Sequence, residues 1–247
     1  MPRLKKEHLI NWFKEGEKKR EDWKIGTEHE KFVFHLNNLE RVGYFGKSGV
    51  SELLNNLAKE NKWEKILEKN NTIALKDETG ASISLEPGGQ LELSGAPLDN
   101  LHQTCRETGR HLKIMKKAMK KLGLSMIGLG YDPKWSRSKQ NWMPKGRYKI
   151  MKNFMPKVGQ LGLDMMLRTC TIQVNLDYLN EQDMVQKFQT SLAYNPLQQL
   201  FSLILHLLKV KKVDIYLQEQ WSGQILTQIE LVYQKLFLMN LLAMRNG

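Results

Sequence analysis

The sequence is poor in cysteine and has no long apolar run, and these absences remove several classes of protein from consideration. Only two cysteines, Cys105 and Cys170, occur in 247 residues, and neither stands in a CxxC or Cys/His spacing. This usage fits a reducing compartment and gives no sign of a zinc site. The most apolar stretches, residues 203–208 and 236–244, are far shorter than the roughly 20 residues that cross a bilayer. The lysine-rich start lacks the apolar segment of a secretory signal, so we expect a cytoplasmic protein with no membrane partner.

Acidic residues are also few, with 26 Asp and Glu against 38 Lys and Arg, which gives a formal net charge of +12. The positive electric field of such a protein attracts nucleic acid, anionic lipid or an anionic small substrate, and net charge alone does not distinguish among these partners. The densest lysine run, residues 113–121, has the spacing of a solvated helix face opposite Met115 and Met119. No RNP, zinc-finger or helix-turn-helix motif accompanies it, so we predict no nucleic-acid partner.

The apolar pattern predicts helices and strands in mixed order. Helices are expected at residues 6–20, 48–59, 99–122 and 147–154, the second with Ser48 as its N-cap. Strands are expected at residues 24–36, 72–76, 81–86, 90–94, 124–129 and 169–177. The turn at residues 77–80 joins two of these strands in a hairpin. Antiparallel hairpins with helices between some of them indicate an α+β protein rather than a doubly wound one.

The first candidate site is the segment KIGTEHEKF at residues 24–32. In a strand, Glu28 and Glu30 point to the same face, and His29 points to the other. Two neighbouring carboxylates repel each other unless a cation lies between them, and their hard oxygen atoms suit Mg²⁺. The alternative is a solvated acidic edge that is paired with nearby lysines.

Two further strands carry polar side chains on one face. Glu86 stands before the Pro87-Gly88-Gly89 turn, and Glu92 follows it, so carboxylates flank the turn and favour a metal over bare phosphate. In residues 171–177, Gln173 and Asn175 lie on a polar face opposite an aliphatic one. Amides can donate to and accept from a ligand or a metal-bound water, although a polar face that simply faces water has the same pattern.

Two arginines are candidate anion clamps, because a guanidinium binds two oxygen atoms at once. They are Arg147 and Arg168, which stand shortly before the last predicted strand. Surface salt bridges are the alternative interpretation.

Three long motifs and Trp135 together resemble the glutamate-cysteine ligase family of plants and many proteobacteria. The motifs are KIGTEHEKF, SLEPGGQLELSGAPLDNLHQTC and MPKGRYKIMKNFMPKVGQLGLDMMLRTCTIQVNLD, and the resemblance covers about residues 20–202. It implies a fold related to glutamine synthetase, in which an antiparallel sheet with flanking helices curves into a funnel, here truncated. It also implies that ATP phosphorylates the side chain of L-glutamate and that the amino group of L-cysteine then attacks, which is the first step of glutathione synthesis.

The resemblance also implies roles for the candidate residues. Glu28, Glu30, Glu86 and Glu92 are expected to bind Mg²⁺. Gln173 and Asn175 are expected to contact the metal, ATP or the substrate, and Arg147 and Arg168 are expected to clamp anions. A relative that uses another amine, a non-catalytic interaction protein and a nucleic-acid binder are the competing interpretations.

The resemblance stops after Ser202, where the family continues with a segment rich in proline and threonine. Residues 203–247 are instead rich in leucine and glutamine and contain no proline. Back-translation of this segment in a shifted frame permits a family-like continuation that begins NSPFTEGK. We therefore expect residues 1–202 to be the N-terminal part of a catalytic domain and residues 203–247 to be an out-of-frame tail, with little or no ligase activity in the chain as written.

Overall fold

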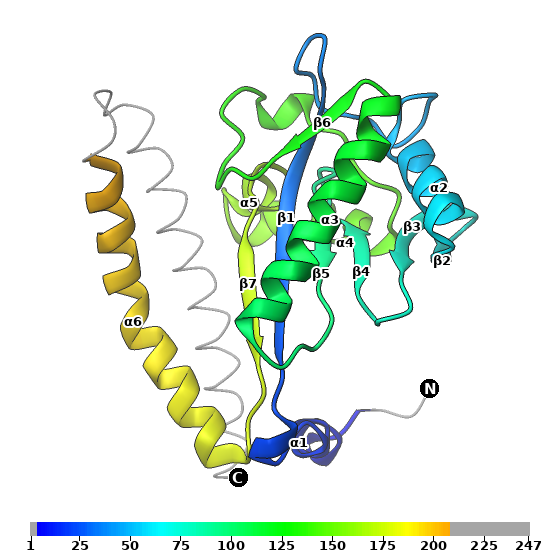
Figure 1. The fold of residues 1–247 in the computed structure, drawn as a ribbon. Helices are drawn as coiled ribbons and strands as arrows, with labels where there is room; N and C mark the ends of the chain where they lie inside the picture. The colour runs from blue at the N-terminus through cyan, green and yellow to red at the C-terminus, as the bar shows by residue number, and fades with distance from the viewer. Residues whose placement is uncertain (1–3, 208–247) are drawn as a thin grey trace. The chain divides into compact units, whose positions relative to one another are not determined.

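The computed structural model describes residues 4–207 and divides into two compact units (Figure 1). One unit is residues 24–175, and the other joins residues 4–23 to residues 176–207. All eight predicted site residues belong to the first unit. The expected boundary at residue 202 falls inside a helix, and residues 208–247 of the expected tail lie outside the described residues.

The unit of residues 24–175 is built on a seven-stranded sheet with the order β2-β3-β4-β5-β1-β6, and β7 also pairs with β1. Antiparallel pairing is recorded between neighbours along the whole β2 to β6 path. The strands are β1 (Ile25–His35), β2 (Glu64–Glu68), β3 (Asn71–Lys76), β4 (Ser82–Leu85), β5 (Leu91–Ser94), β6 (Leu124–Ile127) and β7 (Ile172–Leu176). The predicted α+β class with an antiparallel sheet is confirmed.

The long strand β1 organises the sheet. Its segment from Glu28 to Lys31 pairs with β5, and its segment from Phe32 to His35 pairs with β6. The backbone amide of Glu30 also donates to the carbonyl of Thr171 at 3.1 Å, which joins β1 to the β7 segment. Three strands that carry predicted site residues, β1, β5 and β7, are therefore neighbours in space.

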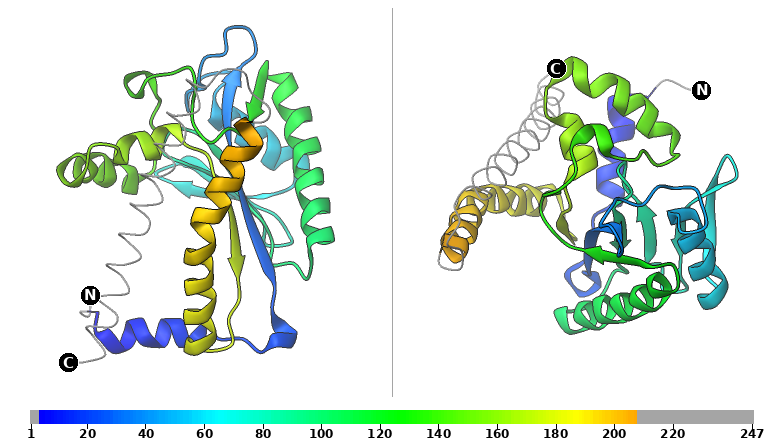
Figure 2. Two further views of the ribbon diagram at one scale, coloured as in Figure 1. Left: turned by 90° about the vertical axis from the view of Figure 1, so that its left-hand side faces the viewer. Right: turned by 90° about the horizontal axis from the view of Figure 1, so that it is seen from above.

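Two helices cover one face of this sheet. They are α2 (Val50–Asn61) and α3 (Leu101–Lys121), and their buried side chains Leu53, Leu54, Met115 and Met119 belong to one core with Leu75 and Ile83 of the sheet. α4 (Gly146–Val158) lies on the opposite side of the sheet from α3 (Figure 2). α5 (Gly162–Arg168) packs against α4.

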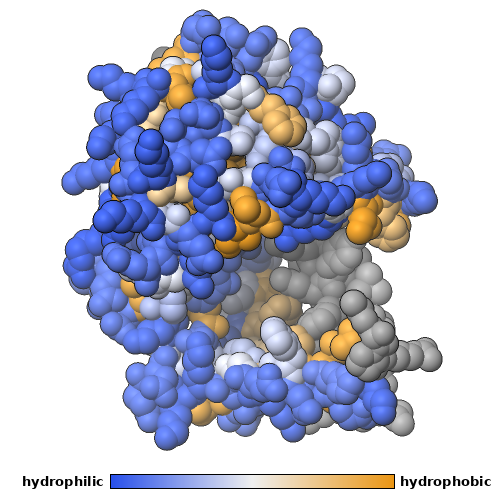
Figure 3. All heavy atoms as spheres, turned by 90° about the vertical axis from the view of Figure 1, so that its right-hand side faces the viewer, coloured by the Kyte–Doolittle hydropathy of each residue, from blue (hydrophilic) through white to orange (hydrophobic). Residues whose placement is uncertain are grey.

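The charged surface agrees with the amphipathic pattern of these helices. Lys113, Lys116, Lys117, Lys120 and Lys121 are all exposed on α3, as predicted for a solvated face. Figure 3, which views the side that carries α2 and β2, shows a mainly hydrophilic surface with only small separate hydrophobic groups. None of the helices in residues 4–207 is both long and apolar enough to span a bilayer.

Several local expectations were wrong. The N-cap of α2 is Gly49 rather than Ser48, and it makes no side-chain cap. β2, α5 and α6 (Glu181–Leu207) were not predicted. The aliphatic side chains of β7 are uncovered, with Ile172 72% and Val174 57% exposed, so this strand lies at the edge of the sheet with both faces open.

The second unit contains α1 (Lys6–Glu15), the short 3₁₀ helix Arg20–Asp22 and α6. Within it, Glu17 forms a parallel bridge with Tyr178, and Lys18 forms an ion pair with Asp177 at 2.7 Å. The ammonium group of Lys187 lies 3.5 Å from the ring centroid of Trp23. These contacts join the two chain segments of this unit.

Candidate functional site

Three carboxylates share one face of the central sheet, opposite the face that α3 covers. Glu30 of β1 lies directly across from Glu92 of β5, and Glu28 lies across from Ser94. The hydroxyl of Ser94 donates to Oε1 of Glu92 at 2.6 Å. Side chains at alternate positions of paired strands project to the same side, so Glu28, Glu30 and Glu92 form one acidic group.

The β7 segment adds polar side chains to this face. The backbone amide of Thr171 donates to Oε2 of Glu30 at 2.9 Å, and its hydroxyl donates to Oε1 at 3.1 Å. The amide of Asn175 donates to Glu28 at 2.8 Å, and the amide of Gln173 donates to the hydroxyl of Thr171 at 3.2 Å. The structure therefore brings Asn175 directly to a predicted carboxylate, whereas Gln173 reaches Glu30 only through the hydroxyl of Thr171.

Glu86 completes the acidic group from the end of β4. Burial, and then repulsion from Glu92 and Glu30, raises the pKa of the Glu86 carboxyl to about 7, although Lys145 and Arg147 oppose this shift. Burial also raises the pKa of Glu30, and repulsion from Glu92 and Glu28 adds to it, while the two hydrogen bonds from Thr171 act in the other direction. The four carboxyl groups are thus held close enough to repel one another when ionised, and a bound cation would relieve this repulsion.

Two basic side chains stand beside Glu86. Arg147, at the start of α4, forms an ion pair with the Glu86 carboxylate at 3.7 Å, and its guanidinium is largely exposed. Lys145 is only 9% exposed, and burial lowers the pKa of its ammonium group, opposed by Glu86 and Glu92. Carboxylates beside cations can hold a metal and anionic oxygen atoms in the same place.

Arg168 is not brought to this group by any contact of the described residues. Its guanidinium donates to Asp164 at 3.2 Å and to the carbonyl of Asp132 at 3.3 Å, and it lies 4.3 Å from the ring centroid of Tyr131. These contacts hold the end of α5 in place.

The turn before β5 is braced by contacts from the protein itself. Buried Arg41 donates to the carbonyl of Gly88 at 3.1 Å, and the amide of Met143 donates to the carbonyl of Pro87 at 2.9 Å. Gln90 is also buried and donates to the carbonyls of residues 166 and 169 at 3.2 and 2.8 Å. These contacts brace the turn through its carbonyls and through Gln90, and they fix the positions of Glu86 and Glu92 on either side of it.

Two contributors to the site, Thr171 and Arg41, were not predicted from the sequence. Thr171 was noticed only as part of an alternating pattern, yet it bonds both oxygens of Glu30. Arg41 gave no local signal, because its burial depends on segments that are distant in sequence. His29 was predicted to point to the opposite face of the sheet. Its Nε2 does lie on that face, 3.5 Å from the hydroxyl oxygen of Thr108 on α3.

The donor set fits a hard divalent cation by its chemistry. Carboxylate and amide oxygens are the ligands that Mg²⁺ accepts, usually together with water and phosphate oxygens. No group of three or more His, Cys, Asp or Glu side chains in residues 4–207 is arranged closely enough to hold a metal unaided. A cation here would thus draw some of its ligands from water or a bound phosphate.

Comparison with known proteins identifies what the chain is similar to. The family model described as glutamate-cysteine ligase family 2 matches residues 24–199. A chloroplastic glutamate-cysteine ligase A of Oryza sativa subsp. japonica is 53% identical over 194 residues, which cover 78% of this chain and 39% of that protein. The chloroplastic enzymes of Brassica juncea and Arabidopsis thaliana are 53% and 52% identical over 194 residues, with 37% and 36% of their lengths covered. The chain therefore spans about two fifths of the length of these relatives.

The names of these relatives correct the expected cytoplasmic location, because each is described as chloroplastic. Cysteine content reflects the redox state of the compartment, and net charge sets the electric field around the folded domain. Neither property identifies an organelle. Organelle addresses are read by receptors, so composition of the domain does not encode them.

Proposed function

The chain belongs to glutamate-cysteine ligase family 2, and on that premise we propose that the polar face of its sheet is part of the site at which a full-length member joins L-glutamate to L-cysteine with ATP. The observation that supports this most is the pairing of Glu30 with Glu92 beside Glu86, whose pKa is raised to about 7. We propose further that this sheet is part of a funnel like that of glutamine synthetase.

The reaction has two balanced steps. An oxygen of the glutamate side-chain carboxylate attacks the γ-phosphorus of ATP, and ADP leaves. The amino nitrogen of cysteine then attacks the acyl carbon, phosphate leaves, and the nitrogen loses a proton to form the amide. Both steps gather negative charge on phosphate oxygens, so charge neutralisation and alignment matter more than a strong base.

Each group on the polar face has a role in this proposal. Glu28, Glu30, Glu86 and Glu92 would hold Mg²⁺, which when bound neutralises phosphate charge and orients the phosphate oxygens. Gln173 and Asn175 orient the carboxylates or contact substrate through their amide groups. Arg147, with Lys145 beside it, would bind a phosphate or carboxylate. We assign Arg168 to positioning α5.

Binding of Mg-ATP tests this site independently of turnover. A ligand that binds only the folded state raises the melting temperature, so Mg-ATP is expected to protect the wild-type chain from thermal unfolding. Glu30→Gln and Glu92→Gln should abolish most of this protection. Glu78→Gln is the matched control. Glu78 is exposed in the turn between β3 and β4, so this substitution makes the same charge change away from the proposed site. If Mg-ATP protected all four proteins equally, Glu30 and Glu92 would not belong to the nucleotide site.

We also propose that residues 203–247 come from a shifted reading frame and that the chain as written lacks ligase activity. The family match ends at residue 199, close to the expected junction. Resequencing the gene across the codons for residues 200–209 tests the frame directly. Formation of γ-glutamylcysteine by the purified chain from glutamate, cysteine and Mg-ATP would refute the loss of activity.

A non-catalytic interaction protein is the second candidate. It is favoured by the open aliphatic side of β7, where Ile172 and Val174 are 72% and 57% exposed. Exposed apolar edge strands readily pair with other chains. This candidate would be supported over the first if the chain without ligand self-associated or bound a protein partner and Mg-ATP did not protect it from thermal unfolding.

A further inference from the structure

A cavity lies on the other face of the sheet from the carboxylates, between α3 and strands β3 to β5. Its volume is about 240 Å³, and it is lined entirely by residues of the 24–175 unit. Leu93 faces this cavity, whereas its neighbours Glu92 and Ser94 face the carboxylate group on the other side of the sheet. The cavity is therefore separate from the proposed ligase site.

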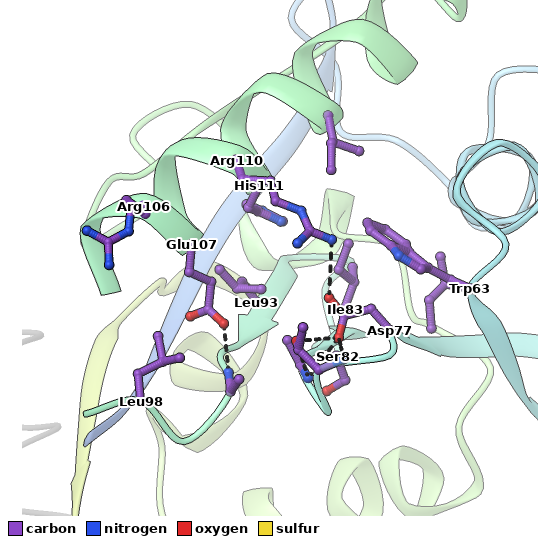
Figure 4. Close-up of a pocket in the computed structure, with 15 residues that line it drawn as sticks. Trp63, Asp77, Ser82, Ile83, Leu93, Leu98, Arg106, Glu107, Arg110 and His111 are labelled. Atoms are coloured by element: carbon purple, nitrogen blue, oxygen red, sulfur yellow. Dashed lines mark hydrogen bonds and ion pairs between the residues drawn. The ribbon is translucent and has the colours of Figure 1, made fainter. Parts of the chain in front are cut away.

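The inner part of the cavity is apolar. Leu75, Ile83 and Leu93 form its sheet side, and Ile114 of α3 and Trp63 add to the wall. Figure 4 shows Ile83, Leu93 and Trp63 around the cavity. Leu75, Ile83 and Leu93 are at most 4% exposed, so they form a fixed floor. The engineered cavity of about 150 Å³ that binds benzene is smaller, so this one has room for a ring and a short substituent.

The outer part carries two guanidinium groups. Arg106 and Arg110 stand one turn apart on α3, and both line the cavity. Arg110 forms a loose ion pair with Asp77 at 3.8 Å, while Arg106 makes no hydrogen bond or ion pair with any residue between 4 and 207. An uncommitted cation therefore stands at the mouth of an apolar cavity.

Two carboxylates, Asp77 and Glu107, also line the cavity, and their negative charges limit how much negative charge a bound ligand can carry. Oδ1 of Asp77 accepts from the backbone amides of Thr79 and Ala81 at 2.8 and 3.1 Å. Oε1 of Glu107 accepts from the backbone amide of Ala96 at 2.8 Å. Both carboxylates are thus anchored to the backbone near the arginines, and their two negative charges offset the two guanidinium groups, which disfavours a multiply charged phosphate chain more than a single carboxylate.

We propose that this cavity binds a small monocarboxylate with a compact apolar body, such as a phenyl ring on a short chain. The ring lies on Leu75, Ile83 and Leu93, and the carboxylate pairs with Arg106, while Arg110 keeps its partner Asp77. Buried His111 borders the cavity and can donate an N–H to the same ligand. This proposal does not depend on the proposed ligase function.

Isothermal titration calorimetry of the full chain with 3-phenylpropionate tests it without metal or nucleotide. Saturable one-site binding is expected. The neutral analogue 3-phenylpropan-1-ol should bind about tenfold more weakly, because it loses a charge-assisted hydrogen bond. Arg106→Gln should weaken 3-phenylpropionate about fivefold, the size of an exposed ion pair.

Lys113→Gln is the matched control, since it removes one positive charge from the exposed face of the same helix. It should leave the affinity unchanged. Equal binding of the acid and the alcohol would overturn the carboxylate assignment, and equal weakening by Lys113→Gln would reduce it to non-specific charge attraction. Absence of saturable binding by either compound would overturn the site.

Discussion

His111 links the folding of the 24–175 unit to pH. The side chain is 7% exposed on α3 and is packed toward Lys31 and His29 of β1, with Glu107 and Arg110 nearby on its own helix. Burial, and then repulsion from Lys31 and His29, lowers the pKa of His111 to about 4 from an ordinary value of 6.5. The folded chain therefore keeps this imidazole neutral at pH 5, whereas the unfolded chain protonates it.

The sign and size of the effect follow from proton linkage. Between pH 6.5 and pH 4 the unfolded state binds more protons at this position, so stability is complete above pH 6.5 and falls as the pH drops toward 4. Between pH 7 and pH 5, the two pKa values give a loss of about 2 kcal/mol in the free energy of unfolding.

Urea unfolding followed by tryptophan fluorescence at pH 7 and pH 5 measures this loss. His111→Gln should lose about 2 kcal/mol less than the wild type over this interval, because the other titrating groups are common to both proteins. His102→Gln makes the same substitution at an exposed position of α3 and should behave as the wild type does. The reasoning is refuted if His111→Gln and wild type lose the same stability.

Two other substitutions test how the carboxylate strands are held. Gly88→Ala would place a Cβ 2.5 Å from the carbonyl oxygen of Leu167, so it should lower the free energy of unfolding by about 2 kcal/mol, whereas Gly109→Ala, with open space around it, should be neutral or stabilising. Tyr148→Phe removes the hydroxyl that donates to the buried carbonyl of Leu85 and should cost about 1–3 kcal/mol. Urea titrations measure both, and a neutral Gly88→Ala or Tyr148→Phe would show that these contacts do not brace the turn and α4.

The strands with site residues could be predicted because their signal is local. A period of two residues places Glu28 with Glu30, and Gln173 with Asn175, on single faces regardless of the rest of the fold. The pairing of Glu30 with Glu92 could not be predicted, since register depends on contacts between segments about 60 residues apart.

The missed elements lack the usual local signals. The first four residues of β2 are exposed, so no apolar alternation marks it. α5 has seven residues and no side-chain N-cap, which is too short for a clear helical period. The burial of Lys145 and Arg41 depends on packing between distant segments, and no spacing rule reports it.

Binding of Mn²⁺, as a paramagnetic substitute for Mg²⁺, tests the central claim that the carboxylates of β1, β4 and β5 form a cation site. Electron paramagnetic resonance of free Mn²⁺, titrated with the protein in the presence of ATP, gives the affinity directly. The wild type and Glu78→Gln are expected to bind Mn²⁺, and Glu30→Gln and Glu92→Gln are expected to bind it at least about tenfold more weakly. Equal affinity in all four proteins would contradict the claim.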